Sequence, residues 1–128
     1  MEEYIVEAKN IKNNEIIKIK IIVNDESDNI IIYTNINNIY YTSSDDSYFE
    51  AFKKLKDILL EKGYGLNCLG AKINAVQSAM ASGSDKIYIV ELGKQASGIK
   101  SIFDYCDNCS YPNKEEQDLY CKKWKDSL

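Results

Sequence analysis

Two residue types that often serve in catalysis and phosphate binding are missing from this chain of 128 residues. It has no histidine, and all 16 of its basic residues are lysine, so arginine is missing as well. Without histidine the chain lacks the usual general base near neutral pH, the Ser–His and Cys–His nucleophile pairs, and imidazole ligands for metals. Without arginine it lacks the planar cation that grips phosphate or guanine through two hydrogen bonds. We therefore favour a function other than catalysis and expect no nucleic-acid partner.

Long apolar runs are missing too. No stretch approaches the roughly 20 apolar residues that span a membrane, and the first ten residues, MEEYIVEAKN, are acidic and lack the apolar segment of a signal peptide. The four cysteines of such a chain are expected to be reduced thiols. We predict a cytoplasmic protein without a membrane partner, and the length predicts a single domain over residues 1–128.

The charge of the chain is negative and uneven. The net charge is −4, with four Lys against ten Asp or Glu in residues 1–50 and twelve Lys against ten in residues 51–128. An acidic first half complements a basic partner, although a solvated surface produces the same pattern. Asp25, Glu26 and Asp28 share one turn and are the candidate acidic contacts, because their spacing does not match a calcium loop.

The first third of the chain has the pattern of antiparallel strands. Ile, Val and Tyr gather in short segments separated by Asn and Asp clusters. In the second segment Ile17, Ile19 and Ile21 alternate with other residues, which indicates one buried face and one wet face. We predict strands at 3–9, 15–23, 29–34 and 36–42.

A long helix follows at residues 47–62. Ser47 and Glu50 form an S-x-x-E capping box, and Gly63 suits the position after the last turn. One apolar stripe is expected to pack on the sheet: Tyr48, Phe52, Leu55 and Leu59. The other face is expected to meet solvent: Lys53, Lys54, Lys56, Asp57 and Glu61.

The remaining elements are weaker except for the last helix. Residues 64–69 and 86–93 have the composition of strands. Residues 73–82 place Ile73, Val76 and Met80 at the spacing of a short helix or turn. The structure of residues 101–105 is ambiguous. Asn113 and Glu116 start a terminal helix at 114–127, with a packing face of Leu119, Tyr120 and Trp124. The order predicts an α+β fold, in which one long helix and a C-terminal helix pack on an antiparallel sheet that begins as a β-meander.

The motif CDNC at 106–109 has three interpretations. Two thiolates at this spacing grip one zinc ion, with Cys68 and Cys121 as further ligands. A redox pair is the second interpretation, although no helix is expected to begin at the motif. Two incidental thiols in a loop are the third. No second C-x-x-C and no histidine completes a metal site, so we predict neither a metal nor a cofactor.

Small residues crowd the stretch NCLGAKINAVQSAMASGSDK at 67–86. Close packing of a helix on a strand explains them, and so does a loop that binds a partner or ligand, where a helix starting near Asn74 would offer free N–H groups. Neither nucleotide-binding glycine pattern is present. The candidate binding residues in this stretch are Cys68, Gly70, Asn74, Ser78 and Met80.

Several blocks resemble a group of short bacterial proteins that has no assigned function. These blocks are SYFEAFKKLKDILLEKG, NCLGAKINAVQSAM, KIYIVELG, IFDYC and EEQDLYCKKWKDSL, which together cover about residues 44–128. The resemblance implies that the 67–86 stretch is a feature of the group. It implies no catalytic residue, and Cys106, Cys109 and Cys121 match none of its patterns.

Two functions agree with these observations. The first is a small acidic inhibitor that binds a basic protein by occlusion, such as an immunity protein that neutralises the toxin domain of a bacterial toxin. The alternative is a small ligand-binding or enzymatic domain that uses residues 67–86, with Ser78 and Cys68 as polar contacts and Lys72 as a charge partner. We favour the inhibitor.

Overall fold

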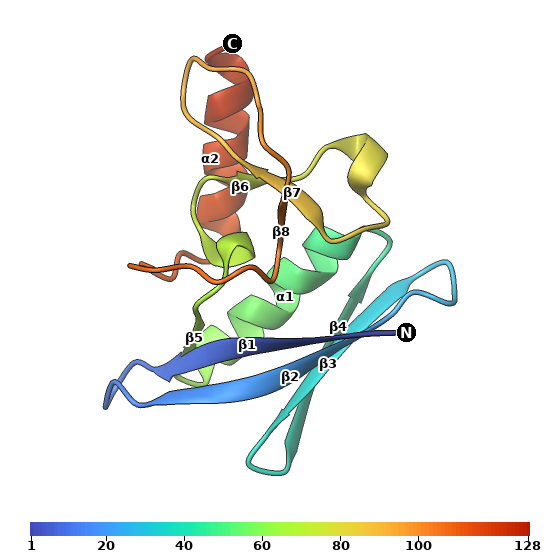
Figure 1. The fold of residues 1–128 in the computed structure, drawn as a ribbon, viewed down its shortest axis with the longest axis vertical. Coiled ribbons are helices and arrows are strands. Elements are labelled where there is room, and N and C mark those ends of the chain that lie inside the picture. The colour runs from blue at the N-terminus through green and yellow to red at the C-terminus, as the bar shows by residue number, and fades with distance from the viewer.

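The computed structural model describes residues 1–128 and has the α+β fold that the sequence predicts (Figure 1). The chain forms, in order, β1 (Glu2–Asn10), β2 (Ile16–Asn24), β3 (Ile30–Ile36), β4 (Ile39–Asp45), α1 (Tyr48–Glu61), β5 (Tyr64–Leu66), β6 (Ala75–Val76), β7 (Lys86–Ile89), β8 (Lys100–Ser101) and α2 (Lys114–Asp126). Short 3₁₀ turns lie at Leu69–Ala71 and Ala79–Ala81.

The first sheet is antiparallel, with the strand order β4-β3-β2-β1-β5. The predicted meander is confirmed, and Ile19 and Ile21 are buried as their alternation indicates. The fourth strand begins three residues later than expected, at Ile39. Asn37 and Asn38 both have positive φ and form a two-residue hairpin turn between Ile36 and Ile39, a conformation that asparagine tolerates well.

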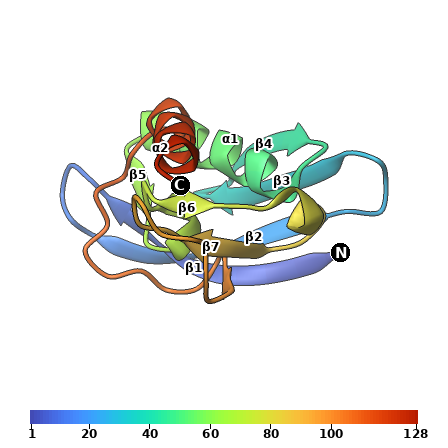
Figure 2. The ribbon, with the colours of Figure 1, turned by 90° about the horizontal axis from the view of Figure 1, so that it is seen from above.

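Helix α1 packs its apolar stripe on one face of this sheet (Figure 2). Ser47 caps the helix by accepting a hydrogen bond from the Glu50 backbone, as the sequence predicts. The other half of the predicted capping box is wrong, because the Glu50 carboxylate pairs with Lys53 and Lys114 and the Ser47 N–H donates to Asp45 Oδ1. All four residues of the predicted stripe are fully buried: Tyr48, Phe52, Leu55 and Leu59.

The opposite face of α1 departs from the prediction. Lys54 and Glu61 are exposed, but Lys53 is only 5% and Lys56 only 3% exposed. The start of α2 and the segment before it lie over this face, so α1 is covered on two sides (Figure 2). The expectation that these two lysines meet solvent is wrong, because a second layer comes from residues more than 50 positions later in the chain.

The expected helix or turn at 73–82 is replaced by extended chain and a short 3₁₀ turn. Ala75 and Val76 form β6, which pairs with β7, and β8 completes a second antiparallel sheet of three short strands. No helix starts near Asn74, so the proposed row of free N–H groups does not exist. The predicted strand 86–93 ends at Ile89, and the ambiguous segment 101–105 contributes the end of β8 followed by a turn.

Helix α2 has the predicted start but a different packing face. Asn113 and Glu116 form a complete capping box. Trp124 is buried, but Leu119 is exposed, and the fully enclosed residue is Gln117. The Gln117 Nε2 donates to the carbonyl oxygens of Gly70 (2.9 Å) and Lys72 (2.8 Å), so this polar side chain holds α2 to the 69–72 turn. An apolar packing face that included Leu119 is therefore the wrong interpretation.

Close packing explains one half of the small-residue stretch. Gly70, Ala71 and Ala75 are buried, whereas Ser78, Ala79 and Gly83 are exposed. A Cβ atom on Gly70 would lie 2.6 Å from Ile102 Cγ2 and 3.1 Å from the Ile102 carbonyl oxygen. Glycine at position 70 therefore lets the turn approach Ile102, the residue after β8, closely.

We expect Gly70→Ala to lower the free energy of unfolding by about 1–3 kcal/mol, because the added methyl group meets backbone as well as side-chain atoms. Urea denaturation followed by fluorescence measures the change. Gly83→Ala is the matched control, since nothing lies within 4 Å of its added Cβ and its φ is not positive. Equal stability of the two variants would show that the turn is not packed as described.

Candidate functional site at the acidic end of the sheet

The register of the first sheet brings carboxylates from distant segments to one end. Glu2 pairs with Val23 across β1 and β2, and Ile30 pairs with Asp45 across β3 and β4. The start of β1, the β2–β3 turn and the end of β4 therefore lie together, at the end marked by the N-terminus in Figures 1 and 2. We call this region the acidic end: Glu2, Glu3, Asp25, Glu26, Asp28, Asp45 and Asp46.

Only part of this negative charge is balanced by the chain itself. The Asp45 Oδ2 lies 2.8 Å from Lys54 Nζ, and the N-terminal amino group and Lys20 make longer pairs at 3.9 and 3.7 Å. Burial raises the pKa of Asp45, but hydrogen bonds from Lys54 and the Ser47 backbone outweigh it and lower the pKa to about 2. Four carboxylates of the acidic end have no cation within 4.0 Å: Glu2, Asp25, Asp28 and Asp46.

The loop at 77–85 lies beside this end and presents an apolar side chain. The Tyr48 backbone N–H donates to the Ser82 carbonyl oxygen at 2.7 Å, and the Gln77 Oε1 accepts from the Ser47 hydroxyl at 3.4 Å. The loop is thereby held against the first turn of α1, which follows Asp45 directly. Met80, at its tip, is 100% exposed.

The structure divides the candidate residues of the 67–86 stretch between interior and surface. Cys68 and Gly70 are buried, and the Asn74 Nδ2 donates to the Val90 carbonyl oxygen at 3.0 Å. Ser78 and Met80 are exposed. The 3₁₀ turn Ala79–Ala81, which includes Met80, lies on the same side of the molecule as the β2–β3 turn, which includes Asp25, Glu26 and Asp28 (Figure 2).

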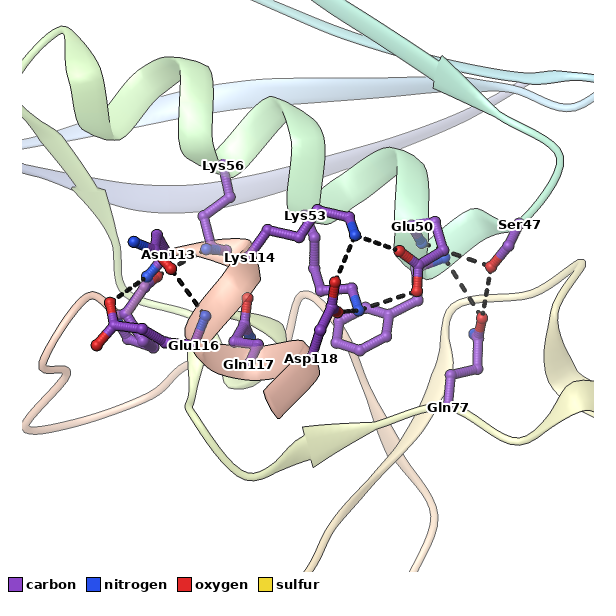
Figure 3. Close-up of polar contacts among 12 residues, drawn as sticks. Ser47, Glu50, Lys53, Lys56, Gln77, Asn113, Lys114, Glu116, Gln117 and Asp118 are labelled. Carbon is purple, nitrogen blue, oxygen red and sulfur yellow. Dashed lines mark hydrogen bonds and ion pairs between the residues drawn. The ribbon is translucent and has the colours of Figure 1, made fainter. Parts of the chain in front are cut away.

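A polar network between α1 and α2 supports this end of the molecule (Figure 3). The Lys53 Nζ lies 2.9 Å from a Glu50 oxygen and 2.6 Å from Asp118 Oδ1. The Lys114 Nζ lies 3.1 Å from the other Glu50 oxygen and 2.6 Å from Asp118 Oδ2. Two cations and two carboxylates thus alternate between α1 and α2, in a contact that we call the α1–α2 joint. It lies beside the Ser47–Gln77 contact.

Sequence reasoning missed Gln77 and Gln117, which fix the candidate loop and α2 in place. The Gln77 Nε2 donates to the carbonyl oxygens of Ser84 (2.8 Å) and Lys86 (3.0 Å), so it braces the loop from inside. The hydrophobic periodicity of the sequence does not indicate either glutamine. Each one hydrogen-bonds to backbone atoms, which Gln117 finds in a distant segment and Gln77 in an irregular loop.

The cysteines are all free thiols. Burial raises the pKa of Cys68 to about 12 and that of Cys109 above its ordinary value. A thiolate is the reactive form of cysteine, so both are protonated and unreactive near neutral pH. No group of three or more Cys, Asp or Glu side chains is arranged to hold a metal ion.

No protein-family model matches the chain, and no curated protein is significantly similar to it. The resemblance of residues 44–128 to a group of short bacterial proteins therefore stays a prediction. No helix of the structure is both long and apolar enough to cross a membrane.

The Lys53–Asp118 network makes stability depend on pH. Burial raises the pKa of Asp118, but hydrogen bonds from Lys114 and Lys53 outweigh it and hold that pKa below its ordinary value. The stabilisation is therefore present above the unfolded-state pKa of about 3.9 and is lost as the pH falls through the lower folded-state value.

We expect Asp118→Asn to cost about 1–2 kcal/mol at neutral pH, since Lys53 is buried and loses a charged partner. The deficit should shrink as the pH approaches about 3, measured by urea denaturation across the pH series. Glu91→Gln is the control, because its pair with Lys94 is exposed on both sides and its loss should not be measurable. A deficit that is the same at both ends of the pH range would contradict the assignment.

Proposed function

We propose that this protein is a small acidic inhibitor that binds a basic protein partner by occlusion, as an immunity protein binds the toxin domain that it neutralises. One observation carries the proposal: carboxylates without a cation partner gather from separate segments at one end of the sheet, and the loop with the fully exposed Met80 is hydrogen-bonded to the residues that follow Asp45 and Asp46. Protein interfaces commonly combine a buried apolar anchor with a polar rim, and methionine is enriched in them.

Electrostatics gives this arrangement a role in association. A patch of one sign raises the encounter rate with a partner of the opposite sign and disfavours partners of like charge. The exposed outer face of the first sheet adjoins the acidic end and offers further contact area through Glu3 and Ile5. The free thiols suit a reducing compartment, so we place the encounter in the bacterial cytoplasm.

Charge reversal at the acidic end tests the proposal. The tagged protein is used to capture proteins from a lysate of its own host, and the bound material is weighed by native mass spectrometry. We expect a stoichiometric basic partner that is released at about 1 M salt, where the Debye length is about 3 Å. Asp25→Lys together with Asp28→Lys should weaken its binding by roughly tenfold or more.

The control makes the same charge change at the other end of the molecule. Glu15 lies in the β1–β2 turn and Glu61 ends α1, and both are exposed. Glu15→Lys together with Glu61→Lys should leave binding unchanged apart from a small general effect of net charge. The captured partner must also lose its activity when one equivalent of wild-type protein is added. Equal weakening by both double variants, or a bound partner that stays active, would contradict the inhibitor.

Met80 tests the apolar anchor separately. Met80→Ala should weaken the same complex by about tenfold, the loss expected when a central interface side chain is truncated. Leu119→Ala is the matched control, because Leu119 is an exposed apolar residue on α2. Neither variant should change the urea midpoint. Unchanged affinity for Met80→Ala, measured by calorimetry on the purified pair, would remove the loop from the interface.

A further inference from the structure

A hollow of about 240 Å³ is lined by residues of β6, β7, the segment after β6 and the last turn of α2. No carboxylate of the acidic end lines it, although Ala79, next to Met80, does. Its walls are mainly apolar: Val76, Ala79, Tyr88, Ala96 and Trp124. Ser78 and Lys125 supply polar groups at its margin.

The aromatic wall of the hollow is held in a fixed position. The Trp124 Nε1 donates to the Lys94 carbonyl oxygen at 2.9 Å, and its ring packs with Val76 and Val90 in a small cluster joined by Tyr88 and Ala96. An apolar cavity of about 150 Å³ is large enough to bind benzene. The hollow therefore has room for one six-membered ring with a short substituent.

A lysine side chain adds positive charge to the lining of this hollow. Lys125 is exposed and makes no ion pair, in contrast to Lys53 and Lys114, which are held by Glu50 and Asp118. Lys125 also borders a neighbouring hollow of about 170 Å³ that is lined by residues at the start of α1, so this lysine lies between the two spaces. An anion placed beside Lys125 would find an unpaired cation at the edge of an aromatic wall.

We propose that this hollow binds a small aromatic carboxylate, with its ring between Tyr88 and Trp124 and its carboxylate paired with Lys125. Burial of the ring supplies most of the affinity, since contact with aromatic side chains removes apolar surface from water. The exposed ion pair with Lys125 selects the anion over an uncharged analogue of the same shape.

Nuclear magnetic resonance tests this directly, because Trp124 is the only tryptophan and gives a single indole N–H signal. The probes are phenylacetate and its uncharged analogue phenylacetamide. We expect phenylacetate to shift the indole signal in a saturable way, with a dissociation constant in the low millimolar range. Phenylacetamide should bind about 2- to 5-fold more weakly, the size of effect expected for an exposed ion pair.

Two variants and one control locate the ligand. Lys125→Gln should remove the difference between the two probes, whereas Lys122→Gln, on the same helix but outside the hollow, should preserve it. Ala96→Leu should fill the hollow and abolish binding of both probes while leaving the signals of the first sheet unchanged. Unaltered binding to Ala96→Leu, or a preference for phenylacetate that survives Lys125→Gln, would overturn the proposal.

Discussion

Two buried lysines on α1 determine how the second half of the chain can be placed. An ammonium group taken out of water is costly unless charged or carbonyl oxygens meet it. Lys53 meets Glu50 and Asp118, and Lys56 donates to the Pro112 carbonyl oxygen at 2.7 Å and to Asp57 Oδ1 at 2.9 Å. Burial lowers the pKa of Lys56, with Asp57 opposing it. The start of α2 must therefore sit where these oxygens reach both lysines.

The same joint sets the path of the irregular segment between the helices. The Asp57 carboxylate also accepts from the Lys114 backbone N–H, which fixes the first turn of α2 on α1. Gln117 of α2 then donates to the carbonyl oxygens of Gly70 and Lys72. Farther along the segment, the Gln77 Oε1 accepts from the Phe49 backbone N–H in the first turn of α1. Hydrogen bonds from polar side chains thus fix the path of the segment between the helices, which contains little regular secondary structure.

Two surfaces of different character result from this arrangement. The first half of the chain supplies the acidic end through its antiparallel register, and the second half supplies the aromatic hollow with Lys125 at its margin. Residues 77–79 border the hollow, and the fully exposed Met80 follows them. The small-residue stretch is therefore closely packed at Gly70 and reaches the surface at Ser78.

The sequence by itself determined the meander, the apolar stripe of α1 and both helix caps, because these depend on local period and on side chains within one turn of the chain. It proposed Asp25, Asp28 and Met80 as contacts, and that role stays a prediction. Only the tertiary structure decided that Lys53 and Lys56 are buried, since a charged stripe indicates solvent unless a distant segment covers it. It also decided that the β2–β3 turn and the end of β4 lie at one end of the sheet and that the 77–85 loop is held against the start of α1, because strand register and the Tyr48–Ser82 hydrogen bond join residues far apart in the chain.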